Sequence, residues 1–151
     1  MEDIYIIPLF IIGCVFISFI IVFSFFIIIK LSALIVLPEK YSELKQKYPY
    51  PLHGYSCLSG SLKFGLIPLY FRGFLKIDVY EKMIIVSSMG QGLCLPYDKY
   101  IFEQRQILFY HALVVKTLSE DDKGYKQKSK SILEIHLSQD KIDTILHLAY
   151  K

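Results

Sequence analysis

The chain has no charged residue between Ile4 and Ile29, a stretch of 26 residues (4 to 29) made almost entirely of Ile, Leu, Val and Phe. As an α-helix this stretch would measure about 39 Å, which exceeds the roughly 30 Å hydrocarbon core of a bilayer. The absence of charge excludes a helix that packs on one side and meets water on the other. It predicts a membrane-spanning helix from Ile4 to Ile29.

Basic residues are also missing before Lys30, where the N-terminal flank holds Glu2 and Asp3 instead. A cleaved signal peptide is the alternative interpretation of the apolar run. It needs a basic n-region, an apolar run of about 7 to 15 residues and a small-residue cleavage site, and the chain shows none of these. The positive-inside rule therefore predicts an outside N-terminus and a cytoplasmic domain, because Lys30 and Lys40 follow the span.

Cysteine is scarce, with three residues in the chain and no CxxC spacing. Cys14 lies in the predicted span, and we expect Cys57 and Cys94 to be free thiols in the reducing cytoplasm. In the opposite orientation these two could form a disulfide. The spacing gives no sign of a metal or redox site.

Catalytic patterns are missing as well. The four histidines do not form paired metal-ligand spacings, and Ser59-Gly60-Ser61 lacks the G-x-S-x-G frame of a nucleophile. Gly90-Gln91-Gly92 lacks the remaining glycines and the following helix of a phosphate-binding loop. We therefore expect no catalytic residue, no metal and no cofactor, and an enzyme is the less favoured alternative.

Three segments follow from the distribution of charge and proline. The apolar pattern continues past Lys30, so residues 1–37 are predicted to form the anchor and a juxtamembrane helix whose last two turns lie in the interface or dock on the domain. Residues 38–54 form a connector in which Tyr41 to Lys47 is helical and two prolines then favour extended backbone. Residues 55–151 form one domain with its own core.

Within this domain the hydrophobic period is two. Leu75, Ile77 and Val79 alternate with polar residues, as do Leu133, Ile135 and Leu137, and turn formers separate about seven such runs. The chain then changes to a helical period, with an apolar stripe formed by Ile142, Ile145, Leu146 and Ala149. The pattern predicts a mainly antiparallel β domain that is closed by a C-terminal amphipathic helix.

Strands followed by one closing helix, together with the Gly92 to Ile101 stretch (GLCLPYDKYI), resemble the pleckstrin-homology-like (PH-like) superfold, including its bacterial and GRAM-type branches. The single span and the Tyr48-Pro49 connector are also similar to small uncharacterised bacterial membrane proteins. The resemblance implies a PH-like β-barrel. The first hairpin offers only Lys63, Arg72 and Lys76, so the sequence does not predict specific phosphoinositide binding.

Two surfaces are candidates for contacts with lipid or a partner. Lys123, Lys126, Lys128 and Lys130 surround a loop and could meet lipid headgroups or an acidic partner, or simply be a solvated hairpin tip. The run from Gln106 to Leu118 is apolar on both faces, which places Leu108, Tyr110 and Val114 on a face that needs a cover. That cover is the closing helix, the juxtamembrane segment or another protein.

These patterns together favour a membrane-anchored binding or scaffold module with a protein partner of unknown identity. The alternative is an accessory or toxin-neutralising (immunity-type) subunit of a membrane complex, in which the anchor itself makes the contacts. The basic surface is too sparse, and too poor in interleaved aromatic residues, to predict nucleic-acid binding.

Overall fold

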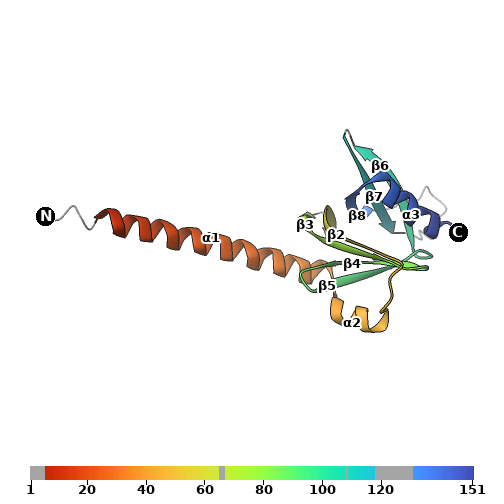
Figure 1. Ribbon diagram of the computed structural model, residues 1–151, viewed down its shortest axis with the longest axis horizontal. Coiled ribbons are helices and arrows are strands. Elements are labelled where there is room, and N and C mark those ends of the chain that lie inside the picture. Colours follow the sequence, from red (N-terminus) through yellow and green to blue (C-terminus); the bar gives the residue numbers. More distant parts are fainter. Residues whose placement is uncertain (1–5, 65–66, 108, 118–130) are drawn as a thin grey trace, which may run out of the picture.

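The computed structural model describes residues 6–64, 67–107, 109–117 and 131–151. A long N-terminal helix, α1 (Ile6–Val36), projects from one side of a β domain, and the C-terminus lies on the opposite side (Figure 1). The remaining elements are β1 (Glu39–Lys40), α2 (Tyr41–Lys47), β2 (His53–Phe64), β3 (Ile67–Val79), β4 (Met83–Ser88), β5 (Gln91–Pro96), β6 (Tyr100–Ile107), β7 (Tyr110–Thr117), β8 (Ser131–Leu137) and α3 (Gln139–Ala149). The predicted apolar helix, antiparallel sheet and C-terminal helix are confirmed.

All strands belong to one antiparallel sheet with the order β1-β5-β4-β3-β2-β8-β7-β6. Strands β2 to β5 follow one another as a meander, and the last strand, β8, returns to pair with β2 through Gly60–Ile135 and Leu62–Leu133. The sheet has eight strands because the connector contributes the two-residue strand β1, which pairs with Gln91 and Gly92 of β5. The two-residue length of β1 explains why no alternation revealed it.

The expectation of a β-barrel is wrong, because the sheet is open. Across the residues that the structure describes, β6 and β1 are the outermost strands and do not pair with each other. Two helices cover the inner face instead. Ile142 and Ile145 of α3 and Ala33 of α1 share one buried cluster with the inner-face residues Phe102 and Leu113.

The end of α1 is part of this domain core. Ala33 and Leu37 are both fully buried, and Val36 packs against the same cluster. Of the two positions predicted for the last turns of the helix, docking on the domain is therefore the one observed. The opposite side of the same turns, with Leu34 and Ile35, stays exposed.

The helix α2 covers part of the other face of the sheet. Its Leu44 forms a second, smaller cluster with Tyr80 and Ile85, and Tyr41 and Tyr48 pack against that cluster. The helix ends at Tyr48, directly before Pro49, since a proline disfavours helical backbone in the residue that precedes it. The predicted helix from Tyr41 to Lys47 is confirmed.

Gly60 sits where β2 passes closest to β8. A Cβ atom at this position would lie 2.3 Å from the carbonyl oxygen of Glu134 and 3.0 Å from the Cα of Ile135. Both are backbone atoms of a paired strand, so they cannot move aside without breaking the ladder between β2 and β8.

We expect Gly60→Ala to lower the free energy of unfolding by about 1–3 kcal/mol, because overpacking forces the two strands apart. Chemical denaturation of the detergent-solubilised protein measures the loss. Gly54→Ala is the control, since its Cβ would meet only a side-chain oxygen of Asp78, at 3.3 Å. Equal losses for the two variants would contradict this account of Gly60.

Candidate functional site

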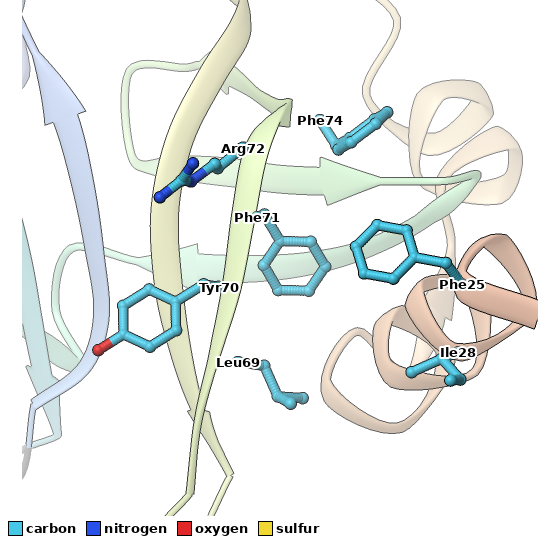
Figure 2. Close-up of a pocket in the computed structure, with 7 residues that line it drawn as sticks. All are labelled: Phe25, Ile28, Leu69, Tyr70, Phe71, Arg72 and Phe74. Atoms are coloured by element: carbon cyan, nitrogen blue, oxygen red, sulfur yellow. The ribbon is translucent and has the colours of Figure 1, made fainter. Parts of the chain in front are cut away.

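A cavity of about 480 Å³ separates α1 from the first half of β3. Strand β3 pairs with β4 only from Lys76 to Val79, so its earlier residues have α1 beside them rather than a strand. Figure 2 shows Phe25 and Ile28 of α1 facing β3 across the cavity, while Tyr70 and Arg72 point away from the helix. The lining residues are Phe25, Ile28, Leu69, Tyr70, Phe71, Arg72 and Phe74.

This cavity is apolar because of the alternation along β3. Leu69 and Phe71 lie on the inner side of the strand, and Phe71 is buried in the core. The ring of Phe74 is half exposed at the rim. Such a cavity can accept hydrocarbon, but it presents no group for acid–base or metal chemistry.

On the other side of β3 a shallower groove of about 590 Å³ lies over Gly60, which has no side chain to fill it. Tyr70 and Arg72 of β3 and His136 of β8 line this groove. The ring of Tyr110 lies 4.2 Å from the ring of His136. The two sides of β3 therefore differ, with hydrocarbon toward α1 and aromatic and cationic groups away from it.

A third pocket, of about 650 Å³, lies between the β3–β4 and β5–β6 turns and the end of α3. Its floor includes Tyr97, whose hydroxyl donates a hydrogen bond to the carbonyl of Tyr80 at 3.2 Å, and burial raises the pKa of Tyr97 well above its usual range. Charged residues of both signs stand at its edge, namely Glu81, Lys82 and Asp98. We call this pocket the distal groove.

A polar cluster holds α2 to the sheet. The hydroxyl of Tyr41 donates to Asp78 Oδ2 at 2.5 Å and accepts from Lys76 Nζ at 2.5 Å, and Lys76 Nζ lies 3.3 Å from Asp78 Oδ1. Only 2% of the Asp78 side chain is exposed, so its charge depends on these two partners. Burial raises the pKa of Tyr41, and the hydrogen bond to Tyr41 raises the pKa of Lys76.

The predicted contact residues of β7 have different positions. Tyr110 is exposed, whereas Val114 is only 1% exposed and lies between Glu103 of β6 and Glu134 of β8. These acids form ion pairs with Lys116 and Arg105, and the long side chains shield Val114.

The opposite side of β7 faces the α3-covered core through Leu113 and Val115. This part of the strand is therefore covered on both faces within the chain. Leu108, Ile4 and the four lysines (Lys123, Lys126, Lys128 and Lys130) lie outside the described residues.

The predicted histidines and cysteines do not come together. Across residues 6–64, 67–107, 109–117 and 131–151, no group of three His, Cys, Asp or Glu side chains could hold a metal ion. Cys57 is exposed and free, whereas Cys94 is half-buried, with its Sγ 3.1 Å from the sulfur of Met83. Burial raises the pKa of the Cys94 thiol, which keeps it protonated and less reactive.

The α1–β3 cavity was missed by sequence reasoning. A signal for it was present, because no charged residue occurs between Lys63 and Arg72, a length unusual for a half-exposed hairpin. Comparison with protein-family models and with curated proteins finds no match to this chain. The site therefore has to be interpreted from its own geometry.

We expect Tyr41→Phe to lower the free energy of unfolding by about 1–3 kcal/mol, because the buried carboxylate of Asp78 loses a hydrogen-bond donor. Tyr50→Phe is the matched control, since Tyr50 is 88% exposed and should contribute nothing. The same pair of variants also tests the pH dependence. A raised folded-state pKa gives stability that is complete below the ordinary tyrosine value of 10.0 and is lost as pH rises through the folded value.

The difference between wild type and Tyr41→Phe should therefore be constant near neutral pH and narrow above pH 10.0. Denaturation curves at a series of pH values measure this difference. A difference that widens in alkali would contradict the assignment of the cluster.

Proposed function

We propose that this chain is a single-pass membrane protein that presents a PH-like binding or scaffold domain at the cytoplasmic face of the membrane. It binds or restrains a protein partner there and catalyses no reaction. Residues Ile11–Val36 of α1 form a helix long and apolar enough to cross a bilayer. The observation that carries the proposal is the burial of Ala33 and Leu37 in the domain core, which fixes the domain to this helix.

The PH-like assignment is supported by the order of elements. A meander from β2 to β5 precedes β6, β7 and β8, the last strand returns to β2, and α3 then covers the inner face through Ile142 and Ile145. This is the succession of strands and a closing helix on which the resemblance rests. The open sheet supports the assignment to the extent that a helix, rather than strand closure, covers the core.

The distal groove is the surface best suited to a protein partner. It lies by the C-terminal end of α3, on the side of the domain away from α1 (Figure 1), so a soluble protein can reach it. Aromatic and apolar residues such as Tyr48 and Met83 form its body, and Lys82 and Asp98 give it charges of both signs. A short peptide segment with an apolar anchor and flanking charges matches this chemistry.

The cytoplasmic orientation can be tested with the exposed thiol of Cys57. In intact cells we expect a membrane-impermeant maleimide to leave Cys57 unlabelled, and to label it after permeabilisation. Cys57→Ser is the control that identifies the labelled site. Labelling of Cys57 in intact cells would show that the domain faces outside.

Replacing the anchor separates the two classes of function. Residues 6–29 are exchanged for an unrelated apolar span, and Lys30 to Leu37 are kept because Ala33 and Leu37 belong to the core. We expect partners captured in mild detergent to be retained by this chimera and lost with Lys82→Glu in the distal groove. Glu43→Lys, at an exposed position on α2, is the charge-change control. Loss of partners in the chimera alone would favour the accessory-subunit alternative.

A further inference from the structure

The cavity between α1 and β3 lies at the depth of the predicted span. Phe25 and Ile28, which line it, precede Lys30 by about 7.5 Å and about 3 Å along the helix axis, at 1.5 Å per residue. Lys30 is the first charge after the apolar run, so its ammonium group marks the headgroup layer. A strand that faces Phe25 and Ile28 across a cavity must therefore lie close to the lipids as well.

The free side of α1 gives independent support. Beyond Lys30, Ala33 and Leu37 are buried in the core, but Leu31, Leu34 and Ile35 are each more than half exposed on the other side of the same turns. No described part of the chain covers these three side chains. An apolar helix surface that continues to the domain indicates that lipid, rather than water, surrounds the junction.

The chemistry of β2 and β3 matches this environment. Tyr70 is 76% exposed and Phe74 is 48% exposed, and both belong to the half of β3 that lies beside α1. The chain has no Asp or Glu between His53 and Asp78, whereas Lys63 and Arg72 are exposed on the two strands. Aromatic residues flanked by cations, without carboxylates, suit the interface of a bilayer with anionic headgroups.

We propose that the first half of β3 docks on the leaflet that surrounds α1, with phospholipid acyl chains filling the α1–β3 cavity. Tyr70 and Phe74 lie at the level of the headgroups and upper acyl chains, and Arg72 lies near lipid phosphate. The domain thus rests on the membrane instead of standing away from it. This inference rests on the proposed membrane anchoring of α1.

The absence of tryptophan from the chain makes the test direct, since any introduced tryptophan is the only one present. Three full-length variants are placed singly in nanodiscs that contain zwitterionic and anionic phospholipids. Phe74→Trp reports the proposed contact, Phe19→Trp reports the middle of α1, and Tyr50→Trp reports an exposed position before β2. Quenching is measured with phospholipids brominated either near the headgroup end or near the methyl end of the acyl chains.

We expect the tryptophan at position 74 to lose most of its emission to bromine near the headgroup end, and the tryptophan at position 19 to bromine near the methyl end. The tryptophan at position 50 should keep its emission in both. If position 19 is quenched and position 74 behaves like position 50, the docking proposal is wrong while the anchor stands. If position 19 is not quenched by either lipid, the membrane anchor itself is wrong.

Tyr70→Trp is a second reporter that does not depend on tolerance at the cavity rim, because the Tyr70 side chain points away from α1 (Figure 2). We expect its emission to be quenched by bromine near the headgroup end. Emission equal to that of the variant at position 50 would overturn the docking of β3. Single copies in each nanodisc ensure that a second copy of the chain is not what covers this surface.

Discussion

The burial of the end of α1 in the β domain is the contact on which the rest of the structure depends. One helix passes from a surface that is apolar all round, between Ile11 and Ile28, to a turn whose side chains are core residues of a sheet. Ala33 and Leu37 fill the inner face beside residues of β2 and β3, where an open sheet would otherwise expose them. Because the sheet does not close on itself, its inner face requires this helix on one side and α3 on the other.

The outer face of the sheet is stabilised differently in its two halves. Over β3 and β4 it is covered by α2, where Leu44 contributes apolar contact and Tyr41 neutralises the environment of the buried Asp78. Over β6 to β8 it has no helix, and ion pairs between neighbouring strands shield small apolar residues such as Val114. A buried carboxylate costs stability unless it is paired, so α2 and the adjoining strands have to form together.

The sequence predicted those elements whose evidence is local. The alternation of Leu75, Ile77 and Val79 identified inner-face residues that are buried, and the stripe through Ile142 and Ile145 identified α3. It did not predict which side of α1 enters the core, because a helix that is apolar all round carries no moment to distinguish protein from lipid. The cluster around Asp78 joins residues 37 positions apart, and openness of the sheet depends on how its outermost strands end; neither leaves a local pattern.

The direct passage from α1 into the sheet also has a mechanical consequence. Leu37 is buried, Pro38 follows, and β1 begins at Glu39, so the junction leaves no slack between the helix and the domain. A helix longer than the hydrocarbon responds to a change in bilayer thickness by changing its tilt. With a rigid junction the domain turns as a lever with the helix, and the direction in which the distal groove opens then reports the thickness of the surrounding lipid.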